Sequence, residues 1–300
     1  MPEPRSHSYH PNKKSKPAPP FSESKLKGVG LEEDMNLKPQ YRAEQYKPAG
    51  KLQNKVALIT GGDSGIGRAV AHIYAREGAD VAITYLPEEK SDAFKTKEFV
   101  ESEGRRCLLI EGDLTEKDFC SLAIKRTVSE FSKINILVSN AAYQKRSNSI
   151  EDISDEDFER TFRTNVFACF YLCKEALPYL HHGDAIIITS SETSQRAPKE
   201  LIDYSATKGA LNTFTKSLAQ SLISQGIRVN AVAPGPVWTP LNPADKGATE
   251  EKIKNFGSNQ PIGRPAQPEE IAPAYVFLAS EADSSYISGA IIAEMGAEPL

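Results

Sequence analysis

A tyrosine and a lysine that could exchange a proton stand four residues apart, in Tyr204-Ser205-Ala206-Thr207-Lys208. On a helix such residues share a face, so the phenol would lie beside the ammonium. A phenol has an ordinary pKa of about 10, and a neighbouring cation lowers it by favouring the phenolate. Taken alone, such a pair is more often an accident of the surface. Ser191, whose hydroxyl could hold a substrate oxygen, makes Tyr204 a candidate general acid–base.

A second candidate is the glycine-rich stretch Thr60-Gly61-Gly62-Asp63-Ser64-Gly65-Ile66-Gly67. An apolar run at 56–59 precedes it, and apolar residues at helical spacing follow it as far as Gly78. A strand, a glycine loop and a helix N-terminus together present free N–H groups and partial positive charge, which suit a pyrophosphate. An ordinary tight turn between strand and helix is the alternative, and the flanking elements favour the nucleotide site.

The elements that position these residues alternate between strands and helices. Apolar runs predict strands at 56–59, 80–85, 107–110, 134–139, 185–189, 228–233 and 287–293. Further helices are predicted at 88–103, 118–131, 154–180, 204–224 and 269–280, with a polar loop at 245–259. This order predicts an α/β fold, a Rossmann-type doubly wound seven-stranded parallel sheet in three αβα layers. Ligands gather at the carboxyl ends of such strands, where both candidate sites fall.

Composition limits the remaining possibilities. Residues 1–50 are rich in proline and charge and predict an extended or disordered N-terminal arm, whereas 51–300 predict one domain. The balance of 36 basic and 40 acidic residues gives no overall attraction to nucleic acid or to a membrane. Apolar runs stay short of the ~18–20 residues of a membrane span. The four cysteines lack metal-ligand spacing, so no metal site is expected. The sequence shows neither a disulfide framework nor a secretory signal, so the expected location is cytoplasmic.

Taken together, the motifs resemble the short-chain dehydrogenase/reductase family over about residues 52–295. They are Thr60-Gly61-x-x-x-Gly65-x-Gly67, Asp113, Asn140-Ala141-Ala142, Asn165, Ser191, Tyr204-x-x-x-Lys208 and Pro234-Gly235-x-x-x-Thr239. The stretches GGDSGIG and LIDYSATKGAL and the proline-rich leader resemble especially the glucose/ribitol dehydrogenase-like subgroup of NADP-dependent aldehyde reductases. The resemblance implies an NAD(P)-dependent oxidoreductase.

The resemblance also implies a role for each site residue. Tyr204 would exchange a proton with the substrate oxygen, and Lys208 would lower the pKa of Tyr204 and bind the nicotinamide ribose. Ser191 would orient the substrate oxygen, and Asn165 would hold a relay water. The implied cofactor contacts are Gly61, Asp63, Ser64, Gly65, Ile66, Gly67, Tyr85, Asp113, Leu114, Asn140, Ala141, Tyr204, Lys208, Pro234, Gly235, Val237 and Thr239. Tyr143, Gln144, Thr193, Trp238 and Leu241 are the expected substrate walls.

Tyr85 bears on the choice of cofactor. NAD-preferring members carry an acid at the end of the second strand, where this chain has Tyr85. Without that acid a 2′-phosphate meets no repulsion, so NADP(H) is expected over NAD(H). Neither Ser64 nor Leu86 is the base that NADP enzymes often carry there, and Lys90 is the nearest base downstream.

Three readings of the function remain open. The first is hydride transfer between NAD(P)(H) and a small carbonyl or alcohol substrate, an aldehyde or a sugar or polyol, by a homotetramer. The second is a 3-oxoacyl carrier-protein reductase, and the third a non-catalytic dinucleotide-binding sensor or scaffold. The chain departs from the family pattern at Ser139, at Ala142 and in its tail after Ile292, and each departure spares the proposed catalytic residues.

Overall fold

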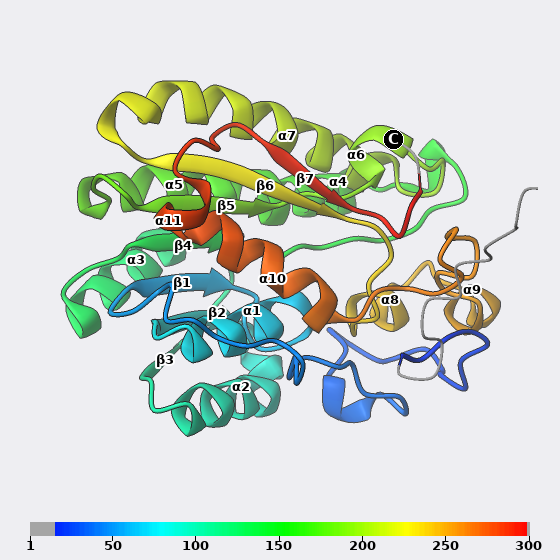
Figure 1. Cartoon of the computed structure of the whole chain (residues 1–300). Coiled ribbons are helices and arrows are strands. Elements are labelled where there is room, and N and C mark those ends of the chain that lie inside the picture. The colour runs from blue at the N-terminus through cyan, green and yellow to red at the C-terminus, as the bar shows by residue number, and fades with distance from the viewer. Residues whose placement is uncertain (1–15, 299–300) are drawn as a thin grey trace, which may run out of the picture.

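Short apolar segments form one parallel sheet in the computed structural model, which describes residues 16–298 (Figure 1). The strands are β1 (Val56–Thr60), β2 (Asp80–Tyr85), β3 (Cys107–Glu111), β4 (Ile136–Ser139), β5 (Ala185–Thr189), β6 (Arg228–Pro234) and β7 (Ile291–Glu294). They lie in the order β3-β2-β1-β4-β5-β6-β7. Strands β1, β5 and β6 are buried along their whole length, as expected of a sheet covered on both faces.

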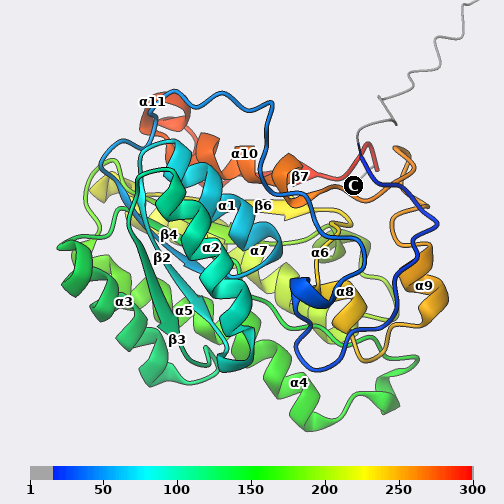
Figure 2. The same cartoon turned by 90° about the horizontal axis from the view of Figure 1, so that it is seen from below.

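Helices cover both faces of the sheet (Figure 2). Helices α1 (Gly65–Arg76), α2 (Lys90–Ser102) and α10 (Pro268–Ala279) pack into the core of one face. Helices α3 (Lys117–Phe131), α5 (Ala168–Ala176) and α7 (Ile202–Leu222) pack into the core of the other. The predicted three-layer Rossmann-type fold is confirmed. Within residues 16–298, every helix is too short or too polar to cross a bilayer.

Shorter helical elements complete the described chain. The 3-10 turns are η1 (Glu32–Asp34), η2 (Pro87–Glu89), η3 (Ile150–Asp152), η5 (Leu177–Tyr179) and η6 (Ile223–Gln225). The remaining helices are α4 (Asp155–Phe162), α6 (Thr193–Arg196), α8 (Leu241–Ala244), α9 (Glu250–Lys254) and α11 (Glu281–Ser284), and η4 (Arg163–Phe167) is a π-helical turn.

The helix predicted over 154–180 forms, but it is not α-helical throughout. The segment starts as expected, with Ser154 Oγ accepting the N–H of Asp157 at 3.1 Å. After α4 it widens into η4, where the N–H of Ala168 donates to the carbonyl of Arg163 five residues back. In this turn the side-chain amide of Asn165 forms hydrogen bonds with Tyr143 and Thr207, which lie outside the helix. Hydrophobic periodicity does not reveal such bonds. The 3-10 turn η5 then ends the segment.

Two other expectations also need correction. The segment 245–259 is not only a polar loop, because it contains α9, capped by Thr249, whose side chain accepts the N–H of Lys252 at 3.3 Å. Ile253 on α9 is buried, and this apolar contact stabilises the short helix. The last strand starts at 291 rather than 287, since Gly289 adopts a φ of +83° just before it.

The described part of the arm, residues 16–50, lies on the chain's own domain (Figure 2). Trp238 Nε1 donates to the carbonyl of Leu37 at 2.9 Å, and Gln267 Oε1 accepts the N–H of Gln40 at the same distance. Near the start of β1, the carboxylate of Glu77 accepts the N–H of Lys51 at 2.8 Å. The arm is therefore held on the domain near its middle and at its C-terminal end.

Candidate active site

The site forms where the strand order reverses, between β1 and β4. At this point Asn140 joins the two strand ends. Its backbone N–H donates to Thr60 Oγ1 at 2.9 Å, and its side-chain amide donates to the Thr60 carbonyl at 3.0 Å. These bonds fix the opening of the glycine loop against the segment that follows β4.

The glycine loop has the shape of a phosphate cradle. Gly61 and Gly65 adopt φ values of +59° and +52°, which other residues rarely do. A Cβ on Gly67 would lie 1.9 Å from the carbonyl oxygen of Gly61, so α1 packs on the loop at a distance only glycine allows. The N-terminus of α1 therefore faces the strand ends at close range, and the residues present fit a dinucleotide diphosphate.

One cleft of about 1410 Å³ runs along the carboxyl ends of the strands. The predicted cofactor residues that line it are Gly61, Asp63, Ser64, Gly65, Ile66, Tyr85, Asp113, Leu114, Asn140, Ala141, Tyr204, Lys208, Pro234, Gly235, Val237 and Thr239. Ser191 lines it too, whereas Gly67 and Asn165 lie behind the surface. The topology thus collects residues from six strand ends in one groove, large enough for a dinucleotide and a small substrate.

The candidate catalytic side chains meet inside this cleft. Tyr204 lies in the first turn of α7, which starts two residues earlier than predicted, and Lys208 follows one turn later. Lys208 Nζ lies 5.3 Å from the centre of the Tyr204 ring and donates to the carbonyl of Thr189 at 2.7 Å. Ser191 follows β5, and its side chain lies close enough to the phenol of Tyr204 to influence the pKa of that group.

Burial decides the protonation of this pair. It raises the pKa of Tyr204 to about 12, although the neighbouring Ser191 side chain acts in the opposite direction. It also lowers the pKa of Lys208 to about 8. The lowering of the Tyr204 pKa by Lys208 stays a prediction: burial is the largest influence on the phenol, and the ammonium donates to the carbonyl of Thr189. At neutral pH Tyr204 is a protonated acid.

Asn165 supports the site from behind. Its Nδ2 donates to the carbonyl of Tyr143 at 3.0 Å and to Thr207 Oγ1 at 3.1 Å, and its Oδ1 accepts the N–H of Tyr143 at 2.8 Å. These bonds connect the segment after β4 to the helix that carries Tyr204. They occupy its side-chain amide, so the relay water remains a hypothesis.

The structure also adds residues that sequence reasoning missed. Residues 27–31 and Asp34 of the arm line the cleft, as does Arg146, which pairs with Asp245 at 2.5 Å. Trp238 was wrongly expected as a substrate wall: its ring is fully buried, 4.2 Å from that of Phe21. The apolar residues among the prolines of the arm, such as Phe21 and Met35, were the sequence signal that the arm packs on the domain.

Comparison with known proteins identifies the family. A family model described as enoyl-(acyl carrier protein) reductase matches residues 61–295. A short-chain dehydrogenase from Burkholderia cenocepacia J2315, solved in complex with NADP, superposes with a TM-score of 0.76. It is 32% identical and covers 82% of this chain and 98% of its own. The chain belongs to the short-chain dehydrogenase/reductase family.

Two further relatives in this family are plant enzymes. NADPH-dependent aldehyde reductase 1, chloroplastic, of Arabidopsis thaliana is 47% identical over 268 residues, 88% of this chain and 92% of the relative. Glucose and ribitol dehydrogenase of Daucus carota is 48% identical over 268 residues, which are 88% of this chain and 91% of that relative. As a short-chain dehydrogenase/reductase, the chain is an NAD(P)-dependent oxidoreductase of a small-molecule substrate, and the predicted resemblance is confirmed.

Proposed function

We propose that the protein transfers a hydride between a nicotinamide cofactor and a small aldehyde, sugar or polyol, with Tyr204 as general acid–base. The observation that carries the proposal is the meeting of Tyr204, Ser191 and Lys208 in one cleft with the glycine loop. The names of the two plant relatives support the substrate class. When bound, the nicotinamide supplies the hydride, and the protein supplies the proton and the orientation.

Each residue has a distinct part in this proposal. Tyr204, protonated at neutral pH, gives its phenolic proton to the substrate oxygen during reduction and takes it back during oxidation. Ser191 donates to the same oxygen and holds it beside the phenol. Lys208 binds the ribose hydroxyls with its ammonium. Asn165 fixes the helix that carries Tyr204 and, we propose, borders a proton-relay water.

The cleft divides into a cofactor part and a substrate part. The glycine loop with Thr239 would hold the diphosphate, and Asp113 with Leu114 would border the adenine. We propose a preference for NADP(H), supported by Tyr85 in place of an acid at the end of β2 and by the NADP named with two relatives. Lys90 lies 3.8 Å from Glu111 and does not line the cleft, so it adds no support to this preference.

The substrate part is polar. Gln144 Nε2 donates to Asp245 Oδ2 at 3.1 Å, and Arg146 pairs with the same carboxylate. Such a wall suits a small hydroxylated substrate. An acidic carrier protein would need unpaired bases at the rim. Lys252 pairs with Glu200 and Arg196 pairs with Glu298 at 3.0 Å, whereas Lys27, Lys246 and Arg160 line the cleft without an ion pair among the described residues. The carrier-protein reductase therefore stays the second reading.

We further propose that copies of the chain assemble as a homotetramer. Phe158, Phe167 and Phe170 lie on the successive elements α4, η4 and α5, and each is more than 40% exposed. Exposed phenylalanines gathered on one stretch of helix favour an interface between copies. A cytoplasmic location is favoured by four buried, unpaired cysteines, which suit a reducing compartment. We also propose that residues 1–50 are an arm and that residues 51–300 form one domain.

Tyr204→Phe tests the proposal. The variant keeps the ring and deletes the transferable proton, so turnover of small aldehydes with NADPH should fall by about 10²–10⁴-fold. NADPH affinity, measured by the fluorescence of the reduced nicotinamide, should stay within about twofold. Wild-type activity in this variant would remove Tyr204 from the role of acid. A wild-type chain that binds NADPH but turns over no aldehyde, sugar or polyol would favour the sensor instead.

A further inference from the structure

Part of the cofactor cleft is built by the arm. Residues 27–31 and Asp34 line the same groove as the glycine loop and Tyr85. Phe21 and Met35, on either side of this wall, are buried in a cluster with Trp238 and Ile253. The wall is therefore anchored at both ends by apolar packing rather than laid loosely over the opening.

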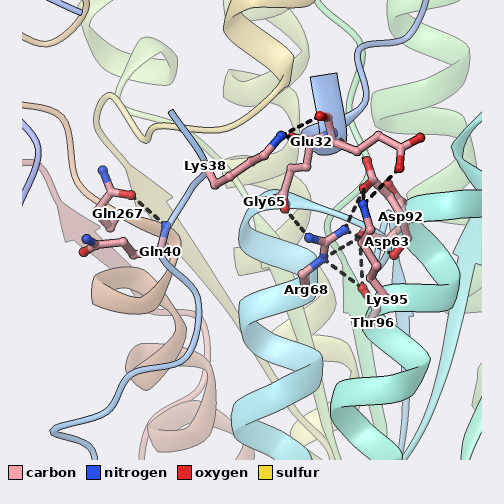
Figure 3. A network of polar contacts seen from close by, with 11 residues as sticks. Glu32, Lys38, Gln40, Asp63, Gly65, Arg68, Asp92, Lys95, Thr96 and Gln267 are labelled. Atoms are coloured by element: carbon pink, nitrogen blue, oxygen red, sulfur yellow. Dashed lines mark hydrogen bonds and ion pairs between the residues drawn. The ribbon is translucent and has the colours of Figure 1, made fainter. Parts of the chain in front are cut away.

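Within this wall, Glu32 is bonded directly to the glycine loop (Figure 3). Its side chain is almost fully buried, and Oε1 accepts the N–H of Gly65 at 2.7 Å. Its other oxygen pairs with the guanidinium of Arg68, on the first turns of α1. One residue of the arm thus bonds both the loop and the helix that would receive a diphosphate.

A second carboxylate completes the connection. Asp92 of α2 accepts the backbone N–H of Glu32 at 2.6 Å, and its Oδ1 pairs with Arg68 Nη2 at 3.1 Å (Figure 3). Arg68 Nε also donates to the carbonyl of Asp63 in the glycine loop, at 2.8 Å. Loop, α1, α2 and arm therefore share one buried network, in which removal of one charge leaves the others without full compensation.

Glu32 supports the loop without occupying the cleft. Among the described residues, Leu31 and Asp34 line the groove but Glu32 does not, so its carboxylate lies behind the loop. Burial raises the pKa of Glu32 to about 7, and Arg68 is the strongest influence in the opposite direction. The carboxylate is thus held by Gly65 at the end of the glycine loop and by Arg68 on the first turns of α1.

We propose that the arm is a working part of the dinucleotide site: residues 27–31 form a wall of the cleft, and Glu32 is a positioning residue that holds the glycine loop in its binding shape. The inference rests on the proposed cofactor part of the cleft. It goes beyond that assignment because it gives the N-terminal extension a function in cofactor affinity.

Glu32→Ala in the full chain tests the inference, with the exposed neighbouring Glu33→Ala as matched control. Glu32→Ala should weaken NADPH binding roughly tenfold, the effect of losing one charge-assisted hydrogen bond. Glu32→Gln keeps an acceptor for the Gly65 N–H and should recover part of that loss, whereas Glu33→Ala should bind as wild type. Trp238, the chain's one tryptophan, reports by its emission whether the arm stays docked.

The outcomes separate the two proposals. Wild-type NADPH affinity in Glu32→Ala would overturn the role of the arm. If Glu32→Ala does not fold, Glu32→Gln decides, and binding as tight as that of Glu33→Ala would overturn it equally. A wild-type chain that binds neither NADPH nor NADH would instead overturn the cofactor assignment.

Discussion

Lys208 carries a charge whose loss should be visible near neutral pH. Its side chain is buried within α7, and burial lowers its pKa to about 8 from an ordinary value of 10.5. The ammonium that would hold the ribose therefore disappears as pH rises through about 8. Tyr204, with a pKa of about 12, stays protonated over this range. One group should therefore control the alkaline limb of the reaction.

The resulting prediction concerns the pH profile of aldehyde reduction. In the wild type, kcat/KM should fall with rising pH, with a midpoint of about 8. Lys208→Met lacks the ammonium at every pH, so its kcat/KM should be lower by about 10²-fold or more and should lose this limb. Initial rates with NADPH between pH 6 and about 10 measure both. An unchanged limb in Lys208→Met would assign it to another group.

At this scale the sequence located the candidate catalytic residues but not their protonation. The pairing of Tyr204 with Lys208 follows from local helix geometry, which spacing reveals. The pKa values depend on burial by segments far away in the chain, which spacing does not reveal. The bonds of Asn165 were likewise invisible, since they join residues 22 and 42 positions apart.

At the scale of elements, strand β7 ends in an unusual carboxylate. Glu294 lies beside Pro234 in the sheet, and its Oε2 has no hydrogen-bond partner within the described residues. Burial raises its pKa to about 8 from 4.5. The folded chain thus keeps a proton that the unfolded chain loses, so stability falls as pH rises from about 4.5 to about 8.

Glu294→Gln should remove this pH dependence. Near pH 4.5 the variant and the wild type should melt together. Near pH 8.5 the variant should melt higher by roughly 2–4 °C, the effect of about 1 kcal/mol in a domain of this size, since the side chain is partly exposed. Thermal unfolding followed by circular dichroism at both values is sufficient. A difference of the same size at both pH values would mean that Glu294 does not titrate there.

The elements were predictable where the signal is repetitive. Seven apolar runs gave seven strands, and the glycine loop gave the start of α1. Helix α9 was missed because five residues carry little periodicity, and its folding depends on Ile253 packing beside Trp238. The π-helical turn and the start of β7 depend on single residues, Asn165 and Gly289, whose surroundings only the fold supplies.

At the scale of the molecule, the exposed aromatic side chains of α4, η4 and α5 lead to a prediction about assembly. Phe170→Glu places a charge in the proposed interface, and burying an unpaired charge is costly. We expect the tetramer to dissociate to smaller species, as measured by sedimentation velocity. Phe94→Glu on α2 adds the same charge to an equally exposed phenylalanine elsewhere and should leave the tetramer intact. Identical sedimentation of the two variants would contradict this choice of interface.

The arm was the largest gap between sequence and structure. Its composition predicted an extended or disordered segment, and composition cannot show that Phe21 and Met35 pack against a tryptophan far along the chain. The cleft could be located from the ends of the strands, but the wall made by residues 27–31 could not.

The anchor of the arm also sets an order of events during synthesis. The bond from Trp238 to the carbonyl of Leu37 spans 201 residues, so its N-terminal partner leaves the ribosome long before the tryptophan does. Domains tend to fold from the N-terminus as they emerge, and contacts between distant segments form late. Residues 27–31 are thus translated long before the tryptophan that anchors the arm, and the groove gains this wall only after Trp238 has been made.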